Sequence, residues 1–84
     1  MLSLRFEPSL PADLAVQLRD PIERAAGDWS GWCEAFVYAV GPAHEVIVRL
    51  TYGQAVLPLL LRGRDLEPER VFATVKGALG HGDF

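Results

Sequence analysis

Hydrophobic and polar residues alternate with a period of two in four segments of this chain, which is the pattern of half-buried β-strands. These segments are residues 2–7, 32–40, 45–52 and 55–62. Pro8 ends the first segment, and the last three are separated only by Gly41-Pro42-Ala43-His44 and by Gly53-Gln54. Turns this short join neighbouring antiparallel strands, so the last three segments predict a three-stranded meander.

The pattern changes to a helical period after Pro8. Leu14, Leu18 and Ile22 recur every four residues and predict an amphipathic helix over residues 11–26. Pro21 falls inside this segment, where it removes one backbone hydrogen bond and disfavours helical geometry in the residue before it. We therefore expect a kinked helix or two short helices that abut.

A second helical stripe lies near the end of the chain, formed by Val71, Phe72, Val75, Ala78 and Leu79. Pro68 suits the first turn of this helix, with Asp65 or Glu67 as the capping residue, and Gly80 is expected to end it. Residues 81–84 are expected to form a flexible tail, which leaves residues 1–80 as one compact domain.

The predicted element order is β-α-β-β-β-α, an α+β two-layer sandwich. We expect a mainly antiparallel four-stranded sheet with both helices packed on one face. Pro58 cannot donate a backbone hydrogen bond, so its strand should lie at an edge of the sheet. The face that carries short side chains is the better seat for the helices, because it lets them approach closely. This choice assigns to the core Leu2, Leu4, Phe6, Cys33, Ala35, Val37, Ala39, Val46, Val48, Leu50, Leu57, Leu59 and Leu61.

The opposite face of the predicted sheet still carries large apolar and aromatic groups. Its members are Arg5, Trp32, Phe36, Tyr38, Ile47, Arg49, Thr51, Val56, Leu60 and Arg62. An exposed apolar patch of a few hundred Å² usually marks an interaction site, and aromatic and Arg side chains are enriched in interface hot spots. We therefore expect a protein-protein interaction module whose partner is another protein or a second copy. The predicted partner-binding residues are Trp32, Phe36, Tyr38, Ile47, Arg49, Leu60 and Arg62.

Two structural explanations compete with this interpretation. Trp32 and Phe36 would be covered if they folded over the edge of the sheet or if the tail lay across them. Trp29 and Trp32 flank the turn between the first helix and the meander. Large side chains at such a corner commonly close the end of a small core, and a protruding anchor for a partner is the alternative.

Binding of single-stranded nucleic acid is the main functional alternative, because aromatic and Arg side chains on an open sheet can stack with bases. The chain carries 11 acidic and 8 basic residues, a net charge of −3, and Lys76 is its single lysine. A negative field disfavours contacts with phosphate backbones, so nucleic acid is the less favoured partner.

The segment Gly41-Pro42-Ala43-His44, followed by residues 45–49, resembles the first hairpin of double-stranded-RNA-binding domains. The helix, three strands and helix of residues 11–80 are similar in order to that family, and membership would imply RNA binding. The second helix of the family opens with a lysine cluster that contacts phosphates. Residues 65–70 here read Asp-Leu-Glu-Pro-Glu-Arg, so the resemblance transfers no functional residue.

No pattern of catalytic, cofactor-binding or metal-ligating residues stands out, and we expect a protein that is not an enzyme. Cys33 and His44 lie at opposite ends of a predicted strand and its following loop, too far apart for a nucleophile and base. Cys33 is the single cysteine, so no internal disulfide is expected and the thiol should be a small buried apolar group. Six acidic residues lie in first turns of the predicted helices or on a helix face, where capping and dipole interactions explain them without catalysis: Asp13, Asp20, Glu23, Asp65, Glu67 and Glu69.

Composition places the chain among folded domains, with 50% hydrophobic and 23% charged residues. The first residues show no basic segment followed by an apolar core, so neither a signal peptide, a membrane span nor a membrane partner is expected. A bacterial-type cytoplasmic protein is the resulting default expectation.

Overall fold

The computed structural model describes residues 2–27, 31–41 and 45–81. Its elements, in chain order, are β1 (Leu2–Phe6), α1 (Ala12–Gly27), β2 (Cys33–Val40), β3 (Glu45–Tyr52), β4 (Ala55–Leu61), the 3₁₀ helix η1 (Gly63–Leu66) and α2 (Pro68–His81). The order of helices and strands confirms the predicted β-α-β-β-β-α fold, with η1 as an addition.

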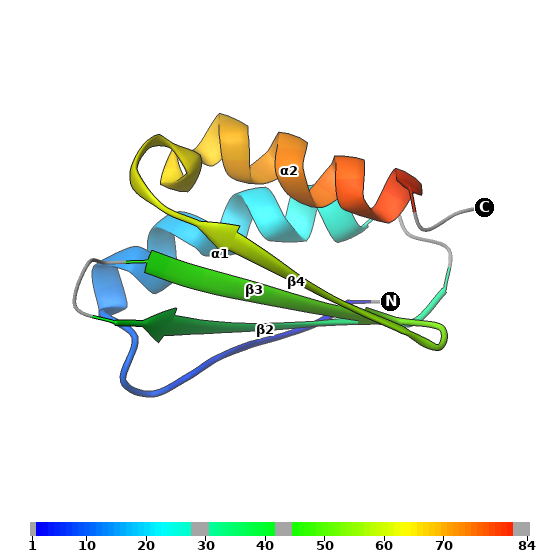
Figure 1. The fold of residues 1–84 in the computed structure, drawn as a ribbon, viewed down its shortest axis with the longest axis horizontal. Helices are drawn as coiled ribbons and strands as arrows, with labels where there is room; N and C mark the ends of the chain where they lie inside the picture. The colour runs from blue at the N-terminus through cyan, green and yellow to red at the C-terminus, as the bar shows by residue number, and fades with distance from the viewer. Residues whose placement is uncertain (1, 28–30, 42–44, 82–84) are drawn as a thin grey trace.

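The molecule has two layers, a four-stranded sheet and a pair of helices that lie along one of its faces (Figure 1). The strands follow the order β1-β2-β3-β4, so β1 and β4 form the two edges. Helix α1 contacts β1, helix α2 contacts β4, and the two helices contact each other. The placement of Pro58 on an edge strand is confirmed.

Strand β1 is parallel to β2, whereas β2, β3 and β4 are antiparallel to one another. Parallel neighbours need a long crossover connection, and α1 supplies it between β1 and β2. The sheet is therefore mainly antiparallel, as expected, with one parallel pair at its β1 edge.

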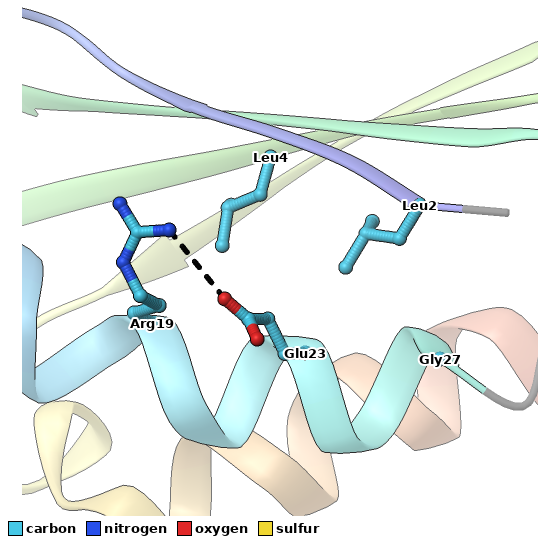
Figure 2. A pocket seen from close by; sticks show the side chains of 5 residues that line it. All are labelled: Leu2, Leu4, Arg19, Glu23 and Gly27. Carbon is cyan, nitrogen blue, oxygen red and sulfur yellow. Dashed lines mark hydrogen bonds and ion pairs between the residues drawn. The ribbon is translucent and has the colours of Figure 1, made fainter.

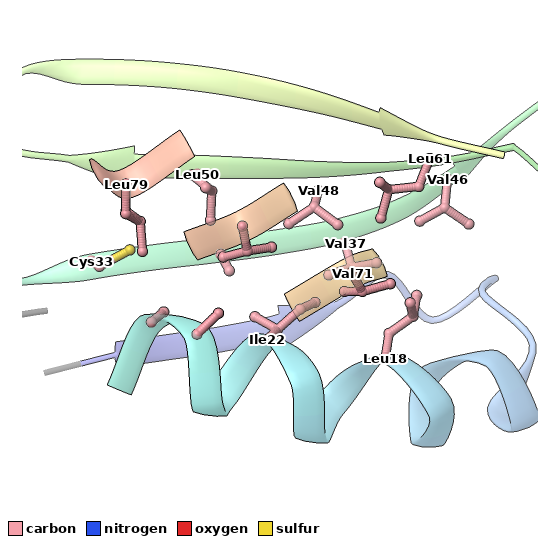
Figure 3. Packing of buried hydrophobic residues seen from close by; sticks show 14 of the residues in the cluster. Leu18, Ile22, Cys33, Val37, Val46, Val48, Leu50, Leu61, Val71 and Leu79 are labelled. Carbon is pink, nitrogen blue, oxygen red and sulfur yellow. The ribbon is translucent and has the colours of Figure 1, made fainter. Parts of the chain in front are cut away.

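The core lies between the sheet and the helices, as Figure 3 shows for its main side chains. Strand β3 alternates strictly between partly buried and buried residues, and β2 does so as far as Val37. Six side chains of the predicted core face in β2 and β3 are fully buried: Cys33, Ala35, Val37, Val46, Val48 and Leu50. The choice of the small-residue face as the seat of the helices is thus confirmed. Toward the edges, Leu2, Leu4, Phe6, Leu57 and Leu59 are only partly buried against the core.

Helix α1 is one continuous helix with Pro21 inside it, so of the two expected alternatives the pair of abutting short helices is excluded. Pro21 removes one backbone donor, but its ring is fully buried against the core. Leu18 and Ile22 on either side of it have no exposed surface. Packing of this stripe against the sheet and α2 keeps the helix intact across the missing bond.

The connection from β4 to α2 contains structure that the sequence pattern did not predict. Strand β4 ends at Leu61, and Arg62 begins the 3₁₀ turn η1 with an extended backbone. Pro68 then occupies the first position of α2, as predicted, and the amide of Val71 donates to the carbonyl of Glu67 at 2.9 Å. The helix continues to His81, one residue beyond Gly80, and residues 82–84 of the expected tail lie outside the described residues.

The hairpin between β3 and β4 fixes the register of the edge strand. Tyr52 pairs with Ala55 across the two-residue turn, and Gly53 has a φ of 57°. Only glycine adopts this backbone conformation without strain, which explains its place in the turn.

The core assignment predicts unequal effects of alanine substitution on the two faces of β3. Leu50→Ala should lower the free energy of unfolding by about 2–5 kcal/mol, because Leu50 is fully buried. Ile47→Ala should cost much less, because Ile47 is only partly buried on the other face, and Leu59→Ala should fall between them. Urea unfolding of the three variants measures this, and equal losses for Leu50 and Ile47 would contradict the assignment.

Candidate functional site: the open face of the sheet

The face of the sheet opposite the helices carries transverse rows of side chains set by the strand register. We call it the open face, and its members are Ser3, Arg5, Glu34, Phe36, Tyr38, Val40, Glu45, Ile47, Arg49, Thr51, Val56, Pro58 and Leu60. One row joins Tyr38, Ile47 and Leu60 across β2, β3 and β4. Because paired residues on one face lie within side-chain contact distance, each row forms a continuous strip.

The central apolar side chains of the open face are partly buried, and those on β4 are exposed. Phe36, Tyr38 and Ile47 are half-buried among their neighbours. Leu60 is 48% exposed and Val56 is 60% exposed. Neither helix of the described chain lies against this face (Figure 1). The sheet thus has apolar side chains on both faces, and the helices cover only one of the two.

Phe36 is the centre of a second row, which runs from Arg5 through Phe36 and Arg49 to Pro58. The guanidinium carbons of Arg5 and Arg49 lie 5.5 Å and 5.3 Å from the centroid of the Phe36 ring. The Tyr38 ring lies 5.5 Å from the Phe36 ring, tilted by 32°. These distances suit cation-π and aromatic contacts, so the two rings and the two cations form one packed cluster.

The two cations of this cluster differ in their ionic partners. Arg5 forms an ion pair with Glu34 at 3.5 Å, and the side chain of Arg5 is 62% exposed. No ion pair of the described residues includes Arg49, which is half-buried in the middle of the sheet. Arg49 therefore presents a positive charge between its cross-strand neighbours Phe36 and Pro58, in contact with the Phe36 ring.

Trp32 and Arg62 lie just outside the strands to which the sequence pattern assigned them. Strand β2 begins at Cys33 and β4 ends at Leu61, so both residues flank the sheet. Trp32 is 51% exposed, which contradicts the expectation that it closes the end of the core. Trp29 lies outside the described residues. The other five predicted partner-binding residues, Phe36, Tyr38, Ile47, Arg49 and Leu60, share the open face.

Arg5 and Glu34 show what the sequence-based list of partner-binding residues left out. Arg5 belongs to β1 and reaches the Phe36 ring only because β1 pairs in parallel with β2. A period-two pattern assigns faces within a strand, but it does not give the register between strands that meet through a helix. The sequence did carry one signal: the alternation of apolar and polar residues in 2–7 had placed Arg5 on this face.

Other candidate chemistry is sparse in the described part of the chain. No group of three or more His, Cys, Asp or Glu side chains there is arranged to hold a metal ion. None of its helices has the length and apolar character to cross a bilayer. Cys33 is fully buried, and burial raises the pKa of its thiol above the ordinary value of 9.0. A protonated, buried thiol is a poor nucleophile. His44, the base considered with it, lies outside the described residues.

Comparisons with known proteins support the fold alone. No protein-family model matches the chain, and no curated protein matches it. Among solved structures, the chain resembles the Protein Y N-terminal domain of Thermus thermophilus with a TM-score of 0.51. The match covers 94% of this chain and 90% of that one at 7% sequence identity. The similarity shows that the α+β architecture is one adopted by a known domain, and at this identity it transfers no function.

Burial of Cys33 predicts a slow reaction with thiol reagents. In the native protein at pH 8, Ellman's reagent should label Cys33 far more slowly than in urea, because the raised pKa and the packing both oppose attack. Because the pKa of the thiol is raised in the native state, the contribution of the neutral thiol to the free energy of unfolding is fully present below the pKa of the unfolded chain. It is lost as the pH rises through the native pKa. Labelling at equal rates in native and unfolded protein would show that the thiol is accessible.

Proposed function

We propose that this protein is a non-enzymatic interaction module that binds another protein through the open face. The supporting observation is the continuous apolar row of Tyr38, Ile47 and Leu60 beside the Phe36 cluster, on a sheet face that no described helix covers. Burying apolar surface against a partner provides the free energy of association. Arg49 adds a specific feature, because a partner carboxylate that meets it would complete an ion pair in a desolvated setting.

Binding of single-stranded nucleic acid through the same residues is the weaker alternative. Base stacking needs accessible aromatic faces, and two guanidinium groups already lie over the Phe36 ring. Glu34 pairs with Arg5 beside that ring and adds negative charge to the site. The net charge of −3 also opposes the approach of a phosphate backbone.

A photo-crosslinking experiment tests the proposed surface directly. A benzophenone amino acid in place of Tyr38 should capture a specific protein in cells, whereas the same group at Ala73, on the exposed side of α2, should not. The captured protein is then purified and titrated against the unmodified chain. If position 38 yields no adduct beyond those at position 73, the open face is not the binding surface.

Substitutions then test whether the partner binds to the open face or to another surface of the molecule. Ile47→Asp should weaken binding of the purified partner by at least about tenfold, because it places an unpaired charge in the apolar row. Ala73→Asp is the matched control and should leave the affinity unchanged. Both variants should retain the far-ultraviolet circular dichroism spectrum of the parent protein, since neither position lies in the core.

Salt dependence distinguishes the two functional classes. Binding of a protein through apolar area should change little between low and moderate salt, whereas nucleic-acid binding loses affinity steeply through counterion release. Tryptophan-fluorescence titration with short single-stranded oligonucleotides at low salt should give no micromolar binding. Salt-sensitive micromolar binding that depends on Arg49 and Arg62 would replace the proposal with the nucleic-acid alternative.

A further inference from the structure

The edge of the sheet at β1 offers a second surface, independent of the open face. Strand β1 pairs with β2 on one side, and no other described strand lies on its other side. A groove of about 360 Å³ runs along this edge, lined by Leu2, Leu4, Arg19, Glu23 and Gly27. Figure 2 shows the two leucines pointing from β1 toward α1, with Arg19 and Glu23 rising from the helix to meet them.

One hydrogen bond shows which backbone N–H and C=O groups of β1 point toward β2 and which point away from the sheet. The amide of Glu7 donates to the carbonyl of Val37 in β2 at 2.8 Å, so Glu7 directs its backbone groups toward the sheet. Backbone groups of successive strand residues point to opposite edges. Arg5 and Ser3 therefore also face β2, and the N–H and C=O groups of Leu2, Leu4 and Phe6 face outward. The same three residues carry the apolar side chains on the helix side of the sheet.

The other edge of the sheet is guarded against such pairing. Tyr52 and Ala55 close the two-residue hairpin as a hydrogen-bonded pair. Alternation from this pair makes Arg49 and Pro58 a non-hydrogen-bonded pair, so the nitrogen of Pro58 faces outward. A proline there removes a donor from the free edge of β4 without weakening the ladder to β3, a known protection of edge strands. Strand β1 contains no proline, and its one charged side chain, Arg5, projects onto the open face.

An exposed apolar side chain on α1 borders the same edge. Val16 precedes Glu23 by seven residues and Gly27 by eleven, close to two and three helical turns, so the three share one side of the helix. Val16 is 74% exposed, the largest exposed fraction among the large hydrophobic side chains of the described chain. The groove and Val16 thus form one surface, with an open strand edge on one side and a partly apolar helix flank on the other.

We propose that this edge binds a second copy of the chain, β1 against β1, to form a two-fold symmetric dimer with one continuous sheet. Antiparallel pairing centred on Leu4 places Leu4 opposite Leu4 and Leu2 opposite Phe6 of the second copy. The groove side of the new ladder is then apolar throughout, and Ser3 and Arg5 meet on the open-face side. Each outward-facing residue exchanges backbone hydrogen bonds with the residue opposite it, as in β-strand addition.

The charges along the groove fit the same symmetry. Arg19 and Glu23 form an ion pair at 3.5 Å beside Leu4. A two-fold axis through Leu4 places the two ion pairs in opposite directions along the edge. Arg19 of each copy then lies on the side of Glu23 of the other copy. The dimer leaves both open faces on one side of the extended sheet, free for the partner proposed above.

Sedimentation of three proteins tests the dimer. The unmodified chain should form dimers in the micromolar range. Leu4→Pro removes the outward N–H and should raise the dimer dissociation constant by at least about tenfold, without breaking a β1–β2 hydrogen bond. Leu4→Ala is the control: it loses at least as much side-chain packing but keeps the N–H, and should dimerise more strongly than Leu4→Pro. A chain that stays monomeric at high micromolar concentration, or a dimer that Leu4→Pro leaves intact, would overturn the proposal.

Two further measurements keep the test decisive. Ile47→Asp should sediment as the parent does, because the open face lies outside this contact, so a dimer lost on that substitution would assign self-association to the open face instead. Amide exchange followed by nuclear magnetic resonance needs no substitution. The Leu4 amide should become protected as protein concentration rises, whereas the Arg5 amide, which faces β2, should stay protected at every concentration. Concentration-independent exchange at Leu4 would also reject the dimer.

Discussion

Both helices pack against the same face of the sheet, and the form of the molecule follows from the burial of that face. The row of Cys33, Ala35 and Val37 is short enough to let the helices approach, and the longer side chains of β3 fill the space beside it. Apolar burial is the main favourable term in folding, and a chain of this size supports one such core. Because both helices pack on one side of the sheet, no described helix covers the second face.

The uncovered face is not an ordinary polar surface. An antiparallel sheet with one solvated face usually alternates between apolar residues inside and polar residues outside. Here the outer positions of β2 and β4 include Phe36, Tyr38, Val56 and Leu60, and the neighbouring Arg5 and Arg49 lie over the Phe36 ring. The Phe36 and Tyr38 rings and the guanidinium groups of Arg5 and Arg49 contact one another, and such contacts restrict the rotamers of the side chains that make them.

The two edges of the sheet are built differently, and the difference follows from chain connectivity. Strand β4 comes from a tight hairpin, and Pro58 blocks its outer side. Strand β1 enters by a helical crossover, which leaves its outer backbone groups beside the flank of α1. An unprotected edge next to a groove is a surface suited to strand addition, whereas the blocked edge is not. The molecule thus has two distinct surfaces, an open face of side chains and an open edge of backbone groups.

The types of the four strands and two helices, the two faces of each strand and the edge position of β4 could be predicted from the sequence, because they depend on local periodicity and on the missing donor of Pro58. The sequence also identified eight of the residues that share the open face, five of them among the predicted partner-binding residues. Tertiary packing set the pairing of β1 with β2, since a strand joined through a helix has no turn that fixes its register. It decided that α1 stays continuous at Pro21, where burial outweighs a lost hydrogen bond, and that Trp32 lies exposed beyond the end of β2. The groove at β1 has the same origin, because residues 2–4 and 19–27 meet only through the packing of the crossover helix against its own strand.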